Sequence, residues 1–320
     1  MHTLPLQLAQ VTMKGAIAAA KSAGFGDKHL ADQAATDALR QSLDQIDTEV
    51  RVVIGEGERD EAPMLYIGEI IGKGKKRKID LAVDPLENTN ATATLGPRAI
   101  SVLAASEPGG LFHAPDMYMN KLIVGPEAAE VVDLDAPVEK NLKNLAKALK
   151  RQVSDLVIVI LDRPRHEELI KQVRATGARV KLIPDGDLLP GIAAVMRGTG
   201  IHAVMGIGAA PEGVITAAAI KCLKGKMQAR FWPKNEAEKK RLIKMGGDPD
   251  KVYTQNELAP GKKLIFSATG VTKGDILEGV RFFSHGARTH TLLIDNMTHQ
   301  VNFIDTIHVF DKKLMEYRLG

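Results

Sequence analysis

The chain has 320 residues, of which 44% are hydrophobic and 26% are charged, with 43 Lys and Arg against 39 Asp and Glu. This composition supports a large core, predicts about two domains, and excludes disordered and fibrous proteins. The net charge of +4 comes without a polybasic tail, so neither nucleic acid nor a membrane is the expected partner.

Apolar runs and cysteine content indicate the cellular context. The run Leu156–Leu161 is far shorter than the roughly 18 residues of a membrane span, and the first ten residues lack the pattern of a signal peptide. The single cysteine, Cys222, cannot close an intrachain disulfide. We therefore expect a soluble, unprocessed protein of the reducing cytoplasm.

The first half of the chain is expected to fold as two helices followed by strands. Apolar positions three and four residues apart predict helices over residues 5–23 and 28–46. Short β-branched or apolar runs predict the strands Val50–Ile54, Ile79–Val83 and Ile100–Ala104. A polar, lysine-rich helix within residues 133–154 marks the boundary that we place between an α+β domain, residues 1–145, and an α/β domain, residues 146–320.

The second half alternates strands and helices. The expected elements, beginning with a strand, are Leu156–Leu161, Glu167–Thr176, Arg179–Ile183, Leu188–Met196, Ala203–Ile207 and Glu212–Leu223. This alternation is typical of parallel strands joined by right-handed crossovers. Residues 224–262 are charged and interrupted by Pro and Gly, so we expect a surface excursion there. The last expected strands are Lys263–Ala268, Thr291–Ile294 and Phe303–Ile307. The sequence is compatible with their joining the sheet of either half of the chain.

The strongest chemical signal is Ala82–Thr89, an apolar strand that leads into a proline-fixed turn. Because Pro85 bends the chain, Asp84 and Glu87 can converge on one cation together with the carbonyl between them. Three hard oxygens suit Mg²⁺ or Mn²⁺, and the threonine that ends the motif is placed to orient a water. Taken alone, the same residues also fit an ordinary turn capped by Asp.

Further acidic residues precede this motif. The strand ending at Ile54 leads into Gly55–Glu61, which carries four carboxylates at the carboxyl end of a strand, where α/β proteins tend to bind ligands. A solvated acidic loop is the alternative. Upstream, Asp27 is expected to cap the second helix, on which Lys28 and Asp32 lie four residues apart. That pair fits either a surface ion pair or a part of the same site.

Three segments of the second half carry residues suited to a sugar phosphate. Gly206–Gly213 joins a strand to an Ala-rich helix and can offer backbone N–H groups to a phosphate, with Glu212 as a helix cap or a metal ligand. Arg163–His166 can clamp an anion, and Asp185–Asp187 can accept sugar hydroxyls. Ordinary loop charges and an Asp-Gly turn explain the last two segments equally well.

Taken together, these motifs resemble class II fructose-1,6-bisphosphatase, one of the lithium-sensitive, metal-dependent sugar phosphatases. The segments that carry the resemblance are Gly55–Glu58, Asp84–Thr89, Ala114–Met119, Arg163–His166, Asp185–Asp187, Gly208–Gly213 and Ser267–Gly270. The resemblance implies a layered αβαβα sandwich, with a metal-binding N-terminal α+β half and a C-terminal α/β half that holds the substrate phosphate. It also implies hydrolysis of the 1-phosphate of fructose 1,6-bisphosphate in gluconeogenesis.

The resemblance also implies roles for individual residues. The implied ligands are Asp32 and Glu56 for one divalent ion, Mn²⁺ or Mg²⁺, and Asp84, Glu87 and Glu212 for a second. Thr89 would help to activate water, with Lys28 and Asp60 assisting. The implied substrate-binding residues are Glu87, Asn88, Thr89, Tyr118, Arg163, Pro164, Arg165, Asp185, Gly186, Asp187 and Ala209. Two positions depart from the family pattern, because Asn88 and Ala209 stand where glycine is expected.

The individual residues of the motifs most resemble those of cyanobacterial-type members of this family, which also accept sedoheptulose 1,7-bisphosphate. A dual activity is therefore a further expectation. The alternatives are an inositol-phosphate or nucleotide phosphatase and a non-catalytic sugar-phosphate-binding regulator. Only 13 of 320 residues are aromatic, which disfavours stacking on a purine. The cationic run Lys73–Lys78 fits a solvated hairpin tip better than a nucleic-acid site. We expect a homo-oligomer, either a dimer or a tetramer.

Overall fold

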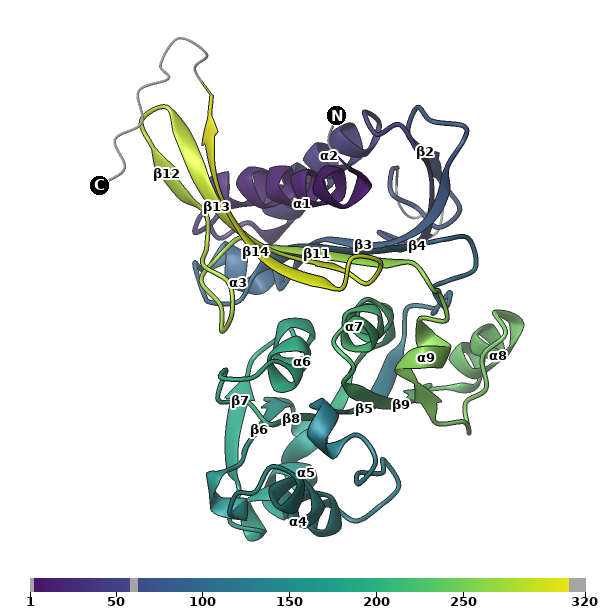
Figure 1. The fold of residues 1–320 in the computed structure, drawn as a ribbon, viewed down its shortest axis with the longest axis vertical. Helices are drawn as coiled ribbons and strands as arrows, with labels where there is room; N and C mark the ends of the chain where they lie inside the picture. Colours follow the sequence, from purple (N-terminus) through teal and green to yellow (C-terminus); the bar gives the residue numbers. More distant parts are fainter. Residues whose placement is uncertain (1–2, 58–62, 311–320) are drawn as a thin grey trace.

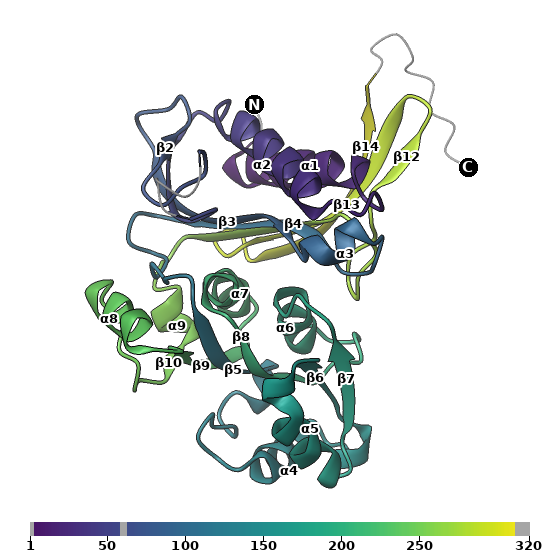
Figure 2. The same ribbon diagram turned by 180° about the vertical axis from the view of Figure 1, so that it is seen from behind.

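The computed structural model describes residues 3–57 and 63–310, and it arranges them in five alternating layers of helix and sheet (Figures 1 and 2). Helices α1 (Leu4–Lys21) and α2 (Lys28–Leu43) cover the outer face of the first sheet. Helices α6 (Leu188–Val195) and α7 (Ala210–Cys222) lie between the two sheets. A further helical layer covers the second sheet, which confirms the expected α/β sandwich.

The first sheet has eight strands in the order β12-β13-β11-β4-β3-β1-β2, with β14 paired to β13. Only β1 and β3 pair in parallel among the described ladders of this sheet. Its strands are β1 (Glu49–Ile54), β2 (Ile70–Ile71), β3 (Lys78–Glu87), β4 (Ile100–Ser106), β11 (Leu264–Gly270), β12 (Arg281–Phe283), β13 (Gly286–Asp295) and β14 (Gln300–Val309). The C-terminal strands therefore complete the first sheet, a choice that the sequence left open.

The second sheet has six strands in the order β10-β9-β5-β8-β6-β7. They are β5 (Tyr118–Val124), β6 (Val157–Leu161), β7 (Arg179–Ile183), β8 (Ala203–Ala209), β9 (Lys226–Trp232) and β10 (Tyr253–Thr254). Strand β6 runs parallel to β7 and β8, as the alternating pattern predicts. The surface excursion expected for residues 224–262 is wrong for β9, which pairs with β5 along its whole length.

The sheets do not divide the chain at the boundary placed near residue 145. The second sheet begins at Tyr118, and the chain returns to the first sheet at Leu264. The first sheet is thus built from both ends of the chain, with the second sheet inserted between them. The division into an α+β domain of residues 1–145 and an α/β domain of residues 146–320 stays a prediction.

The largest hydrophobic cluster lies between the sheets and includes residues of both sheets and of α6 and α7. Helix α7 is buried along most of its length because small and apolar residues occupy every face of it. The remaining helices are α3 (Thr89–Ala93), α4 (Val138–Ala148), α5 (Glu167–Ala175), α8 (Glu236–Lys244) and α9 (Gln255–Leu258). Short 3₁₀ turns occupy Pro126–Ala128, Val153–Asp155 and Pro164–His166. None of the described helices is long and apolar enough to cross a membrane.

Candidate functional site

A cavity of about 310 Å³ lies where the first sheet meets the N-terminal ends of α6 and α7. Seven carboxylates and no cationic side chain are found among the described residues that line it. The lining residues are Asp32, Glu56, Asp84, Leu86, Glu87, Asn88, Thr89, Leu161, Asp185, Gly186, Asp187, Ala209 and Glu212. The fold therefore brings all five predicted metal ligands to one cavity.

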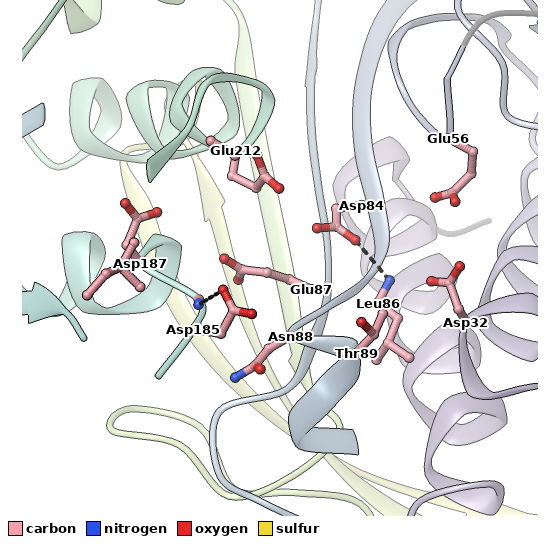
Figure 3. Close-up of a pocket in the computed structure, with 13 residues that line it drawn as sticks. Asp32, Glu56, Asp84, Leu86, Glu87, Asn88, Thr89, Asp185, Asp187 and Glu212 are labelled. Carbon is pink, nitrogen blue, oxygen red and sulfur yellow. Dashed lines mark hydrogen bonds between the residues drawn. The ribbon is translucent and has the colours of Figure 1, made fainter. Parts of the chain in front are cut away.

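The Asp84 motif reaches this cavity through an irregularity in β3. The sequence predicts a proline turn, but β3 continues through Pro85 to Glu87, and its register against β4 shifts between Asp84 and Glu87. In a regular strand, residues three positions apart point to opposite faces, so the bulge is what turns both carboxylates to one side. A carboxylate oxygen of Asp84 accepts a hydrogen bond of 3.1 Å from the backbone N–H of Leu86 (Figure 3).

The two residues that replace expected glycines are accommodated without strain. Asn88 adopts the left-handed conformation, with φ of 69° and ψ of 53°, which Asn tolerates better than other non-glycine residues. Its side chain accepts a bond of 3.4 Å from the N–H of Ala91 and so caps α3, whose first residue is Thr89. Ala209 has an extended backbone, with φ of −68°, that requires no glycine.

Of the site residues that the sequence predicts before β3, some lie at the cavity and others do not. Asp27 caps α2 as predicted, because it accepts bonds of 3.0 Å from the N–H groups of His29 and Leu30. Asp32 and Glu56 line the cavity, from α2 and from the end of β1. Lys28 is exposed at the start of α2 and does not line the cavity. Asp60 lies outside the described residues.

Burial raises the pKa of the five predicted metal ligands, and neighbouring carboxylates raise it further at four of them. Desolvation raises the pKa of Glu56 to about 7, with a further contribution from the charge of Asp32. Desolvation also raises the pKa of Glu212 to about 7. The pKa values of Asp84 and Glu87 lie well above their ordinary range, first because of burial and then because of neighbouring carboxylates. Bringing these groups together as anions is therefore unfavourable without a compensating cation.

The donor set fits a divalent cation. Figure 3 shows Asp84 between Asp32 and Glu56 on one side and Glu87 and Glu212 on the other. The Oε2 atom of Glu212 is buried and has no hydrogen-bond partner, and carboxylate oxygens are the donors that Mg²⁺ and Mn²⁺ prefer. Within the described ranges, no three acidic, His or Cys side chains are arranged to hold one ion by themselves. Holding an ion would thus require small side-chain movements, or oxygens from water or substrate.

The glycine-rich loop expected at Gly206–Gly213 is not a loop. Strand β8 extends to Ala209, where it pairs with Tyr118 of β5, and α7 begins at the next residue. The Nε2 atom of the buried His166 accepts a bond of 2.7 Å from the N–H of Ile207. Glu212 consequently comes from the first turn of a helix that directly follows a strand, which fixes its position relative to the cavity.

Sequence reasoning missed Lys121, a lysine in β5 that is only 1% exposed. Its ammonium group donates to Asp187, with contacts of 2.8 and 2.6 Å to the two carboxylate oxygens, and to the carbonyl of Ala209 at 3.1 Å. Gly208 makes room for this pair, because a Cβ atom there would lie 2.2 Å from an Asp187 oxygen. The partner lies 66 residues along the chain, so no local motif identifies the pair.

The predicted substrate-phosphate residues lie beside the cavity rather than in its lining. Arg165 donates from Nε and Nη2 to the carbonyl of Ile207, at 3.2 and 2.9 Å, and lies 4.7 Å from the ring centre of Tyr118. Arg163 approaches Asp185 at 3.5 Å. Pro164 begins the 3₁₀ turn between these arginines. By contrast, Asp185 and Gly186 line the cavity itself, and Gly186 has a φ of 72°, a conformation that favours glycine.

Comparison with known proteins shows which family and which relatives this chain is similar to. The chain matches the family model described as bacterial fructose-1,6-bisphosphatase, glpX-encoded, over residues 2–308. Proteins named D-fructose 1,6-bisphosphatase class 2/sedoheptulose 1,7-bisphosphatase are similar over nearly the full length. That of Synechococcus sp. (strain JA-3-3Ab) is 50% identical over 97% of this chain and 96% of its own. Those of Synechococcus elongatus and Synechocystis sp. are 47% and 46% identical, over 97% and 96% of both chains respectively.

The buried ion pair generates a prediction about stability. Lys121→Met should lower the free energy of unfolding by about 3 kcal/mol, because it leaves the charge of Asp187 buried and unpaired. The double variant Lys121→Met/Asp187→Asn should lose less than the sum of the two single variants, which urea denaturation measures. Strictly additive losses would show that the two side chains do not stabilise each other.

The raised pKa values predict how the metal-free protein responds to pH. Folded Glu56 and Glu212 keep protons up to about pH 7, whereas in the unfolded chain they lose them near the ordinary value of 4.5. The unfolded state therefore binds fewer protons between these values, so the stability of the metal-free protein should fall as pH rises through this window. Melting temperatures recorded in EDTA should show this fall, and saturating Mn²⁺ should reduce it. A melting temperature that rises over the same window in EDTA would contradict the argument.

Proposed function

The chain belongs to the bacterial fructose-1,6-bisphosphatase family, and we propose that it hydrolyses the 1-phosphate of fructose 1,6-bisphosphate to fructose 6-phosphate and inorganic phosphate. The observation that carries the proposal is the cavity lined by seven carboxylates and the hydroxyl of Thr89, within a chain that matches the family model over residues 2–308. The family is the one that the sequence motifs resemble.

The reaction requires divalent cations, for which the cavity supplies oxygen ligands. We assign Asp32 and Glu56 to one ion and Asp84, Glu87 and Glu212 to a second. When bound, such ions neutralise the phosphate and stabilise the charge that develops on the leaving oxygen. The choice between Mn²⁺ and Mg²⁺ stays open, because both accept this donor set.

The remaining cavity residues position water and sugar. The hydroxyl of Thr89 lies at the start of α3 and would orient the attacking water by accepting or donating one hydrogen bond. Another part of the cavity wall is formed by Asp185, Gly186, Asp187, Asn88 and Ala209, which would bind the sugar hydroxyls. Lys28 and Asp60 are proposed to assist at the reaction centre.

The phosphate that is not cleaved would lie next to this wall, against the residues that follow β6 and begin β5. Arg163, Pro164, Arg165 and Tyr118 are the proposed contacts. The guanidinium of Arg165 is held by the carbonyl of Ile207 and by the ring of Tyr118, and its Nη1 donors make no hydrogen bond within the described part of the chain. A planar, pre-oriented guanidinium is suited to a phosphate.

We also propose activity on sedoheptulose 1,7-bisphosphate, because relatives that are 46–50% identical carry both activities in their names. The comparisons do not support an inositol-phosphate or nucleotide phosphatase or a non-catalytic regulator. A homo-oligomer and a cytoplasmic location stay predictions.

A phosphate-release assay tests the proposed function directly. Purified protein with Mn²⁺ or Mg²⁺ should release phosphate from fructose 1,6-bisphosphate and from sedoheptulose 1,7-bisphosphate, and EDTA should abolish the release. Fructose 6-phosphate and inositol 1-phosphate should be poor substrates. Release from inositol 1-phosphate at a rate equal to that from the bisphosphates would refute the assigned substrate class.

Glu212 offers a sharper test of the metal site. Glu212→Gln keeps the size of the side chain but removes one negative charge from the cation's surroundings, so kcat should fall at least 100-fold. The variant should fold normally, and the rise in melting temperature that Mn²⁺ causes should be smaller. Glu236, an exposed residue in the first turn of α8, provides the matched control as Glu236→Gln. If the two variants have the same kcat and the same rise in melting temperature with Mn²⁺, Glu212 is only a charge at the start of a helix and does not bind the cation.

A further inference from the structure

The ring of Tyr118 contacts two cationic side chains, only one of which belongs to the sequence-predicted site. The guanidinium of Arg165 lies 4.7 Å from its ring centre, and the ammonium of Lys234 lies 4.3 Å from the same centre. The ring of Trp232 is 6.3 Å away. Lys234 follows β9 and precedes α8, in the polar segment that the sequence suggests is a surface excursion.

Neither cation is neutralised by a carboxylate. Within residues 3–57 and 63–310, neither Arg165 nor Lys234 forms an ion pair. In these residues, the hydrogen bonds of the Arg165 guanidinium go to the carbonyl of Ile207, and the ammonium of Lys234 lies over the ring of Tyr118. Two like charges around one ring repel each other, and the electron-rich face of the ring offsets this only in part. An anion within reach of both charges would offset this repulsion.

The backbone holds Lys234 at this position. The N–H of Lys234 donates to a carboxylate oxygen of Glu238 at 2.7 Å, while the side chain of Asn235 accepts from the N–H of Glu238 at 2.9 Å. This reciprocal cap joins the start of α8 to the end of β9. Only the long side chain of Lys234 is therefore left to adjust to a ligand.

The cluster is also adjacent to the catalytic cavity. In the second sheet, Tyr118 pairs with Ala209 on one side and with Trp232 on the other. Ala209 lines the carboxylate cavity. A ligand that extends from the cavity along the end of β5 would thus reach the two cations.

We propose that Lys234 binds the phosphate group of the substrate that is not hydrolysed, together with Arg165 and Tyr118. The proposal rests on the proposed function for the identity of the substrate. A phosphate monoester carries a charge of about −1.5 to −2 at neutral pH, which matches two cations. Lys supplies a mobile point charge and Arg a fixed planar fork, so the pair can accept phosphates at slightly different distances from the cavity.

Binding of fructose 6-phosphate, which carries only this phosphate, tests the proposal without turnover. Isothermal titration calorimetry in EDTA should show a Kd about tenfold higher for Lys234→Met than for the wild type, because one charge-assisted contact is lost. Lys234→Arg should recover most of the affinity. Lys240→Met removes one exposed charge from α8, the helix that follows Lys234, and should leave the Kd unchanged.

Kinetics provide the second readout. Lys234→Met should raise the KM for fructose 1,6-bisphosphate with little change in kcat, and should leave the constants for fructose 1-phosphate unchanged. An unaltered Kd and KM in this variant would overturn the proposal, and so would equal losses with both substrates. If the wild type binds fructose 6-phosphate through Lys234 but releases no phosphate from the bisphosphate, the proposed function fails and the anion site stands.

Discussion

The structure depends on one electrostatic constraint, which is the gathering of seven carboxylates at the junction between two sheets. Burial raises the pKa of five of these groups, and repulsion by neighbouring carboxylates raises it further at Glu56, Asp84, Glu87 and Glu212. Among the described residues, two of the cavity carboxylates have a cationic partner: Asp187 binds the buried ammonium of Lys121, and Asp185 lies 3.5 Å from Arg163. The remaining charge leaves the site suited to added cations.

The fold gathers several of these carboxylates by placing them in a strand of the first sheet and at the starts of the helices between the sheets. Asp84 and Glu87 depend on the bulge in β3, whereas Asp187 and Glu212 lie at the starts of α6 and α7 between the sheets. The chain leaves the first sheet after β4 and returns to it at β11, so the segment that forms the second sheet is joined to the first sheet at both of its ends. The packing of α7 against both sheets then fixes the separation of the two ligand groups.

Much of this arrangement follows from local sequence. The helices and strands that the periodicity predicts are present near their expected positions, and Asn88 shows the left-handed backbone that its motif requires. The exceptions depend on distant partners. In the sequence, Lys121 is an ordinary strand residue, and only the fold brings Asp187 beside it. Strand β9 lies in the charged segment that also contains Lys234, so the sequence does not predict it, although its alternate residues are buried. The C-terminal strands likewise find their sheet only through long-range pairing.

A bisphosphate has two anionic ends of similar charge, so the substrate's charge alone cannot orient it. On the proposed assignments the two ends of the site differ in what they need. The carboxylate cavity repels any phosphate until cations are bound, whereas Arg165 and Lys234 attract one without them. The distal phosphate can therefore bind in the absence of metal, and the cations then decide that only the other phosphate enters the cavity. On the same assignments, cleavage takes place at the cation-dependent end of the site, and the cavity residues proposed to bind the sugar hydroxyls select which phosphate lies there.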